Sequence, residues 1–448
     1  MSDRRQIMEL FEQQKDMVQK YVADGVEKHR KGDMCITVTK NGQPVPRARV
    51  RVTQKTHDFR YGCNLFMLDE LETPEKNARY KEIMRTFGNM YTLPFYWDAT
   101  EPSCGETRYR KDSKPVYRRP PIDLCLEFCE KHGIEPREHA LAYEYFFPKW
   151  LYNASVEEIK AALEKRYAEI AERYADKIHT IEVTNEMVHA RGRTAIYEEP
   201  DYVNYCFELA EKYFPGNQLV INEATRCAWG DCCRTSDKYY AYTEAAMLKG
   251  ARIDAIGMQY HMFFRMEDEY EKTRPYYDPM NLIRHMDLYA RLGKPLQITE
   301  VTVPAYTDSP EDEALQAEII EQLFSIWFAH PAVEQIIYWN MIDGYAHLWD
   351  PDPEKIRKSQ GDMTLGENYY RGGLLRFDMS PKPAYHVIRD LFEKRWRTQV
   401  QGEADENGAY ALRGFFGEYE VEVEDGETVR TQRVHLGKDS RSACVQLD

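Results

Sequence analysis

Ile181-Glu182-Val183-Thr184-Asn185-Glu186 is an apolar, β-branched run closed by a glutamate, and Leu296-Gln297-Ile298-Thr299-Glu300 repeats the pattern. A continuous run of this kind is typical of a strand that is buried on both faces. An ionised carboxylate is costly to bury, so a glutamate in this position is either paired or present for chemistry. The alternative is that each glutamate caps its strand and pairs with an arginine or lysine. We predict that Glu186 and Glu300 close two strands of one barrel and face one cleft.

Strand-like runs recur through the middle of the chain, with amphipathic helices such as 155–175 between them. Eight β/α units over ~340 residues predict a (β/α)₈ TIM barrel, in which the strand C-terminal ends build the active site. A doubly wound sheet is the alternative, but it would not bring the fourth and seventh strands together across one mouth. The expected strands lie near 59–64, 87–92, 138–143, 179–184, 218–222, 253–258, 295–299 and 335–339.

The two ends of the chain have small β patterns of their own. Alternating residues on both sides of Asn41-Gly42 predict a β-hairpin, preceded by a helix over about 5–30. Alternation returns at 409–414 and 419–423. Whether the two ends form one β module or separate appendages stays open. The predicted division is an N-terminal helix and hairpin appendage (1–56), the barrel (57–395) and a small C-terminal β segment (396–448).

The composition narrows the choice of partner and compartment. The 448 residues carry a net charge of −15, which argues against nucleic acid or an anionic membrane as a partner. No apolar run approaches the ~18–20 residues of a membrane span. The polar start of the chain lacks a secretory signal, so we expect a cytoplasmic protein. Aromatic residues make up 13% of the chain, which suits sugar stacking as well as a large barrel core.

The cysteines and histidines do not form a recognisable metal motif. Ten scattered cysteines do not make the regular framework of a disulfide-rich domain. Cys227, Cys232 and Cys233 cluster in one expected loop, but a zinc site there would need a fourth ligand and better spacing. A metal-dependent hydrolase using His139, His189 and His261 is disfavoured because the usual histidine spacings are absent. We therefore expect reduced thiols, no metal and no cofactor.

Six motifs in order resemble glycoside hydrolase family 10, the retaining endo-xylanases, over roughly residues 57–395. They are Trp97-Asp98-Ala99-Thr100-Glu101-Pro102, Arg137-Glu138-His139-Ala140-Leu141, Thr184-Asn185-Glu186, Gly257-Met258-Gln259-Tyr260-His261, Ile298-Thr299-Glu300, and Tyr338-Trp339 with Asp343 and the later Ser380-Pro381-Lys382-Pro383-Ala384-Tyr385.

The resemblance implies a double-displacement mechanism with Glu186 as the acid/base and Glu300 as the nucleophile. It also implies that His261 donates an N–H to Glu300 and keeps it ionised. Asn185 would hold the 2-hydroxyl of the sugar, and Trp339 would form an apolar floor beneath it. The substrate-binding residues expected on this basis are Asn185, His139, Gln259, His261, Trp339, Tyr143 and Trp97.

Several positions depart from the family pattern and put the substrate in doubt. The run Thr92-Leu93-Pro94-Phe95-Tyr96 replaces a polar Glu-Asn-x-Met-Lys segment that binds sugars on the non-reducing side. Tyr143 and Phe146 stand where Trp and Gln are usual. Thr302 replaces an aspartate that normally partners His261, and His347 replaces a tryptophan.

Three functions follow as expectations. The first is hydrolysis of β-1,4-xylosidic bonds in xylan fragments or xylo-oligosaccharides. The second is a retaining β-glycosidase of the same mechanism that acts on a decorated, aryl or non-xylan β-glycoside. The third is a carbohydrate-binding barrel without catalysis. The sequence leaves open the sugar, the endo or exo mode and the oligomeric state, and it predicts an oligosaccharide or glycoside as the partner.

Overall fold

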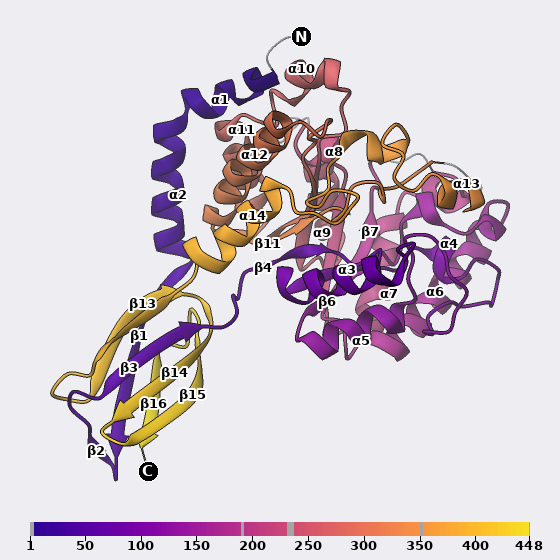
Figure 1. Cartoon of the computed structure of the whole chain (residues 1–448). Helices are drawn as coiled ribbons and strands as arrows, with labels where there is room; N and C mark the ends of the chain where they lie inside the picture. Colours follow the sequence, from indigo (N-terminus) through magenta and orange to yellow (C-terminus); the bar gives the residue numbers. More distant parts are fainter. Residues whose placement is uncertain (1–3, 190–191, 231–236, 350–352, 448) are drawn as a thin grey trace. The chain divides into compact units, whose positions relative to one another are not determined.

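We describe a computed structural model over residues 4–189, 192–230, 237–349 and 353–447 (Figure 1). The chain divides into two compact units. The first unit comprises Met1–Lys15, Tyr61–Gln322 and Ala332–Tyr385. The second comprises Asp16–Arg60, Leu323–Pro331 and His386–Asp448.

The first unit contains a closed barrel of eight parallel strands, which confirms the (β/α)₈ prediction. The strands follow the order β10-β11-β4-β5-β6-β7-β8-β9 around the barrel. Their bounds are β4 (Arg60–Asn64), β5 (Met90–Pro94), β6 (Glu135–His139), β7 (Thr180–Asn185), β8 (Gln218–Glu223), β9 (Ala255–His261), β10 (Leu296–Thr302) and β11 (Val333–Tyr338).

Helices connect successive barrel strands. Helix α6 (Val156–Tyr174), which precedes β7, begins with a capping box formed by Ser155 and Glu158. One face of this helix is buried and includes Ile159, Leu163 and Ile170. The helices are α3 (Pro74–Phe87), α4 (Trp97–Thr100), α5 (Ile122–His132), α6 (Val156–Tyr174), α7 (Tyr202–Tyr213), α8 (Thr225–Ala228), α9 (Lys238–Leu248), α10 (Glu269–Thr273), α11 (Pro279–Ala290), α12 (Pro310–Ala329), α13 (Pro353–Lys358) and α14 (Pro383–Asp390).

The β6 strand begins earlier than the sequence predicts, at Glu135 instead of about 138. Its residues Pro136, Arg137 and Glu138 are polar or helix-breaking, yet all are buried inside the barrel. Arg137 forms an ion pair with Glu182 of β7, so its charge is compensated by the neighbouring strand. The residues around Arg137 do not reveal its ion pair with a residue of another strand. The sequence pattern therefore places the start of β6 too late.

The second unit joins both ends of the chain in two small sheets (Figure 1). The β1 strand pairs with β13 on one side and with β16 on the other, and it is extended by β2. The β3 strand lies between β12 and β14, and β14 pairs with β15. The two termini therefore form one β module, which decides between the two arrangements that the sequence left open.

The module contains most of helix α2 and the eight short strands of its two sheets. Its inner face is a cluster of buried aliphatic residues that includes Ile36, Val38, Val52 and Val421. The N-terminal helices are α1 (Glu9–Gln13) and α2 (Lys15–His29), of which α2 belongs mainly to this unit. The strands are β1 (Lys31–Lys40), β2 (Gln43–Pro44), β3 (Arg49–Gln54), β12 (Gln399–Glu403), β13 (Ala409–Phe415), β14 (Gly417–Asp425), β15 (Thr428–Leu436) and β16 (Ser442–Leu447).

The predicted N-terminal hairpin is only partly present. Asn41 and Gly42 have φ of 51° and 74°, which is the left-handed geometry of a tight hairpin turn. After that turn, however, only Gln43–Pro44 pairs with β1, and Arg49–Gln54 crosses to the other sheet. None of the described helices is both long and apolar enough to cross a membrane.

Candidate active site

A cavity of about 790 Å³ opens where the barrel strands end, within the first unit. Glu186 lies directly after β7 and Glu300 lies in β10, and both line this cavity. Six of the seven predicted substrate-binding residues also line it: Asn185, His139, Gln259, His261, Trp339 and Tyr143. The two carboxylates that the sequence singled out therefore meet in one site.

Glu186 is held by its backbone and by one amide. Its φ of 53° is a left-handed conformation that a non-glycine residue rarely adopts, and its N–H donates to the carbonyl of Asn222 at 3.2 Å. The Gln259 side-chain amide donates to Glu186 Oε1 at 3.0 Å. Burial, together with the nearby charge of this carboxylate, raises the pKa of Tyr143. The strained backbone aims the side chain into the cavity, where Gln259 fixes one oxygen.

Glu300 is more deeply buried, at 4% exposure. Asn222 Nδ2 lies 3.2 Å from its Oε1, and His261 Nε2 lies 3.2 Å from its Oε2. Burial raises the pKa of Glu300 to about 8, and the charges of Glu182 and Glu186 add to this shift. This shift favours the protonated carboxyl, and the ionised Glu300 that the resemblance implies stays a prediction.

His261 connects Glu300 to the neighbouring residue Thr302. Thr302 Oγ1 lies 2.9 Å from His261 Nδ1 and 3.3 Å from the Trp339 carbonyl, so its single hydrogen can be donated to either of them. If the hydroxyl donates to Trp339, Nδ1–H donates to Thr302 and Nε2 accepts from Glu300. If it donates to Nδ1, Nε2–H donates to Glu300, as the resemblance implies. Burial lowers the pKa of His261 to about 4, so the ring is neutral and carries one N–H.

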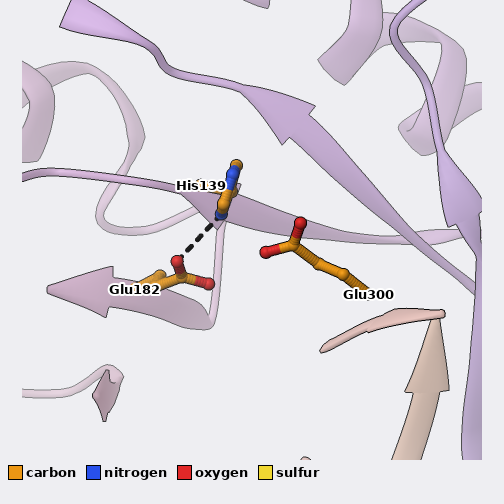
Figure 2. A group of neighbouring side chains, drawn as sticks. All are labelled: His139, Glu182 and Glu300. Atoms are coloured by element: carbon orange, nitrogen blue, oxygen red, sulfur yellow. Dashed lines mark hydrogen bonds and ion pairs between the residues drawn. The ribbon is translucent and has the colours of Figure 1, made fainter. Parts of the chain in front are cut away.

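A second network lies beside Glu300 and centres on Glu182 (Figure 2). His139 Nδ1 donates to Glu182 Oε1 at 2.8 Å, and Arg137 pairs with the other oxygen. Although burial acts to raise it, the pKa of Glu182 is lowered because His139 and Arg137 stabilise the charged form. On its other side, His139 Nε2 meets the Tyr96 hydroxyl at 3.0 Å. Glu182 is therefore the fixed negative charge of the site.

The ligand atoms of His139, Glu182 and Glu300 lie within 4.8 Å of one another, which raises the question of a metal. Both nitrogens of His139 are already engaged, one by Glu182 and one by Tyr96. Glu182 is also paired with Arg137, a cation that would repel a metal ion. The chemistry of this group fits an ion-pair network that orients His139 better than a metal site.

The side-chain amide of Asn185 has an unused hydrogen-bond donor, which indicates a ligand-binding role. Its Oδ1 accepts hydrogen bonds from Gln259 at 3.2 Å and from Asn222 at 3.0 Å. Its Nδ2 is buried and has no hydrogen-bond partner in the part of the chain that the structure describes. A buried amide left without a partner is costly, so this N–H₂ is positioned to donate to a bound hydroxyl.

Trp97 is the one predicted binding residue that the structure places elsewhere. It is 2% exposed and does not line the cavity. Its indole N–H donates to Glu101 at 2.9 Å, and its ring packs edge-on against Phe147 and Trp150. The motif around Trp97 braces the loop after β5, so its role is structural.

The sequence analysis missed several residues of the site. Asn222 closes an apolar run just as the two glutamates do, so the same pattern could have identified it. Glu182 interrupts a buried strand and could have been found as a charge in need of a partner. No local signal marks five charged residues of the cavity wall, of which the first three lie in loops, the fourth in α8 and the last in a short 3-10 helix: Arg118, Arg119, Arg193, Arg226 and Glu367.

The described cysteines are free thiols, and Cys227, in α8, is half-buried. Cys232 and Cys233, the other members of the predicted cluster, lie outside the described residues.

A carboxylate-lined cavity at the C-terminal mouth of a (β/α)₈ barrel is the architecture of a glycoside hydrolase. The model of the family Glycosyl hydrolase family 10 matches residues 68–391. The chain therefore belongs to this family, as the motifs suggested.

The proteins that this chain resembles match it at low identity. Endo-1,4-beta-xylanase 2 of Arabidopsis thaliana is 25% identical over 366 residues, covering 80% of this chain and 29% of that protein. Anti-sigma-I factor RsgI6 of Acetivibrio thermocellus is 22% identical over 391 residues, covering 86% and 44%. This chain thus spans less than half of either relative. The crystal structure of xylanase 10B from Thermotoga petrophila RKU-1 in complex with xylobiose superposes with a TM-score of 0.59 at 21% identity, covering 75% of this chain and 95% of that one.

Proposed function

We propose that the protein is a retaining glycoside hydrolase that cleaves β-1,4-xylosidic bonds in xylan fragments or xylo-oligosaccharides. The observation that carries the proposal is the pairing of Glu186 and Glu300 in one cavity, each held by its own amide. Membership of the family supports the reaction class. The xylanase relatives, and the xylobiose in one similar structure, support the choice of sugar.

In the proposed reaction Glu186 acts as the acid/base and Glu300 as the nucleophile. Glu186 protonates the leaving oxygen while Glu300 attacks the anomeric carbon and forms a glycosyl ester. A water molecule then gives a proton to Glu186 and releases the sugar from Glu300 with retained configuration. The Asn185 amide would bind the 2-hydroxyl, since its Nδ2 is buried and has no hydrogen-bond partner among the described residues.

The raised pKa of Glu300 bears on this step, because only the ionised carboxylate can attack the anomeric carbon. Turnover therefore requires the enzyme form in which Glu300 is ionised and Glu186 carries the proton. Asn222 donates to Glu300 Oε1 and would stabilise the carboxylate once it forms. Trp339, which packs edge-on against His139 at 5.4 Å between ring centroids, would supply the apolar floor beneath the sugar.

Hydrolysis of a panel of aryl β-glycosides tests the proposal: xyloside, xylobioside, glucoside and cellobioside, with Glu186→Gln and Glu300→Gln run alongside. We expect cleavage of the xylobioside and a loss of roughly 10²–10⁴-fold in each variant, as for other removed acid–base groups. Glu208→Gln, on the exposed face of α7, is the matched control and should keep full activity. Silence of the folded wild-type protein on every substrate would support the non-catalytic binding barrel instead.

The second function is a retaining β-glycosidase acting on a decorated glycoside. One observation favours it, namely the cationic wall of the cavity, in which two adjacent arginines are buried.

A further inference from the structure

Two consecutive arginines form part of the cavity wall. Arg118 is 2% exposed and Arg119 is 8% exposed, and both line the space that contains Glu186 and Glu300. Arginines are almost never buried to this extent unless an acid pairs with them. Both lie in the loop between α4 and α5, and Arg118 has a φ of 59°, a left-handed conformation that fixes the loop in an unusual path.

Arg119 has no acidic partner at hydrogen-bond distance. Its guanidinium stacks on the ring of Tyr96, 3.6 Å from the ring centroid, and Nη1 donates to the Arg118 carbonyl at 3.0 Å. Across residues 4–447, as far as they are described, no carboxylate forms an ion pair with it within 4.0 Å. Stacking on an aromatic face supports a guanidinium but leaves its in-plane donors available.

Arg118 is only partly satisfied. Its Nη2 donates to Asn340 Oδ1 at 2.7 Å. The nearest carboxylate oxygen, Glu367 Oε2, lies 4.0 Å from Nη1, which is beyond hydrogen-bond reach. Nε and Nη1 are buried and lack a hydrogen-bond partner among the described residues. A buried donor without a partner costs about 1–3 kcal/mol, more when the group is charged, so this edge of the guanidinium is suited to a ligand.

The arginine pair lies close to the reacting groups. Tyr96, on which Arg119 stacks, meets His139 at 3.0 Å through its hydroxyl. His139 in turn belongs to the close group with Glu182 and Glu300 (Figure 2). One aromatic side chain therefore separates the cationic wall from the carboxyl network. An anionic group bound there would belong to a sugar at the cleavage point or next to it.

We infer that the cavity binds a glycoside that carries a carboxylate, a uronosyl sugar, and that Arg118 and Arg119 hold that carboxylate. Guanidinium groups match a carboxylate with two parallel hydrogen bonds, so two adjacent ones define an anion site with a fixed orientation. The net charge of −15 repels anions at long range, so a built local site is needed to select an acidic substrate. Arg193 and Arg226, exposed at the rim, add positive charge to the same cavity.

The test compares kcat/KM for a xylo-oligosaccharide with a glucuronosyl substituent against the same oligosaccharide without it. We expect the wild-type protein to prefer the acidic substrate by about 10- to 100-fold, the effect of one or two charge-assisted hydrogen bonds. Arg119→Gln should abolish the preference for the acidic substrate. Arg119→Lys keeps the positive charge but loses the two parallel N–H donors of the guanidinium, so it should retain part of the preference. Arg79→Gln, an exposed arginine of α3, is the matched control. Thermal melts establish that each variant is folded.

The inference extends the proposed function, and the outcomes separate the two. Equal or better turnover of the neutral substrate by the wild type would overturn the inference and leave the xylan-cleaving reaction standing. No turnover of either substrate, with binding of the acidic one that is weakened in Arg119→Gln, would overturn the reaction and support the anion site. If the variants fail to fold, the salt dependence of the wild-type protein still tests the inference. The ratio of kcat/KM for the acidic substrate to that for the neutral one should fall as NaCl is raised, and a ratio independent of salt would refute an electrostatic site.

Discussion

Glu300 has two neighbours that could stabilise its charge, Asn222 and His261, yet burial dominates its pKa. His261 does not offset the effect of burial on Glu300, because the other nitrogen of its ring faces the neutral hydroxyl of Thr302. A hydroxyl supplies no negative charge to the ring, and burial lowers the pKa of His261 to about 4, so the neutral ring brings no positive charge to Glu300. We therefore expect the acidity of Glu300 to depend on the identity of residue 302.

Replacing Thr302 with Asp tests this dependence. A carboxylate at 302 would favour the doubly protonated ring of His261, whose Nε2–H would donate to Glu300 and lower its pKa. The acidic limb of the wild-type kcat/KM profile, on which Glu300 becomes ionised, should lie above the range of an ordinary glutamate because burial raises the pKa of Glu300. In Thr302→Asp this acidic limb should move to lower pH. Thr302→Asn, similar in size but neutral, should leave it in place, and an identical shift in both variants would contradict the explanation.

The raised pKa of Glu300 also has a consequence for stability. Its pKa rises from 4.5 to about 8 on folding, so between these values the folded state holds a proton that the unfolded state releases. Stability from this group is therefore present at low pH and is lost as pH rises toward 8, with a cost on the order of a few kcal/mol. Glu300→Gln cannot ionise. Its melting temperature should exceed that of the wild type by more at pH 9 than at pH 5, and an equal difference at both would refute the shift.

At the scale of elements, β8 and β9 touch at a position that leaves no room for a side chain. A Cβ on Gly257 would lie 2.4 Å from Asn222 Oδ1, and Asn222 is the amide that contacts Glu300 and Asn185. Thr299 of β10 donates to the same Oδ1 at 2.8 Å. The close approach of these strands thus sets the position of the Asn222 amide, which contacts both Asn185 and Glu300.

Gly257→Ala should therefore affect activity more than stability. We expect a destabilisation of about 1–3 kcal/mol from overpacking, and a fall in kcat of about 10- to 100-fold as Asn222 is displaced. Gly216→Ala, where a Cβ meets nothing within 4 Å, is the control. Steady-state kinetics and thermal melts report the two effects, and a variant with wild-type kcat would show that the position of Asn222 is not critical.

Element by element, the sequence predicted what is local. The apolar runs 181–186 and 296–300 each predict a buried strand and include the glutamate that ends it. The barrel and its two central glutamates could therefore be predicted from the sequence. The polar strand β6 and the loop arginines could not, because their burial depends on partners such as Glu182 and Tyr96 that lie far away in the sequence. Trp97 shows the converse, since its motif is recognisable but its contacts are structural.

At the scale of the whole molecule, the N-terminal and C-terminal segments complete each other's sheets. β1 runs parallel to β16, with Thr37 opposite Cys444, and the Thr39 hydroxyl lies 3.8 Å from the Cys444 sulfur. Strands of this kind have unpaired edges on their own, so neither end of the chain can form the module alone.

Thr39→Cys should therefore form a disulfide with Cys444 under oxidising conditions. The bond would link the two ends of the chain and stabilise the module by up to a few kcal/mol. Electrophoresis without reductant and melts with and without it would detect the cross-link. Thr39→Cys combined with Cys444→Ser is the control, and an uncrosslinked protein would show that these strands are not neighbours.

The most direct test of the account is to trap the glycosyl ester. A β-xylobioside with a good leaving group, and with fluorine in place of the hydroxyl next to the anomeric carbon, should inactivate the protein. Mass spectrometry of its peptides should then show one added disaccharide on the peptide that contains Glu300, and none in Glu300→Gln. Hydrolysis that proceeds without any adduct, or an adduct on a different residue, would contradict the assignment of Glu300 as the nucleophile of a retaining hydrolase.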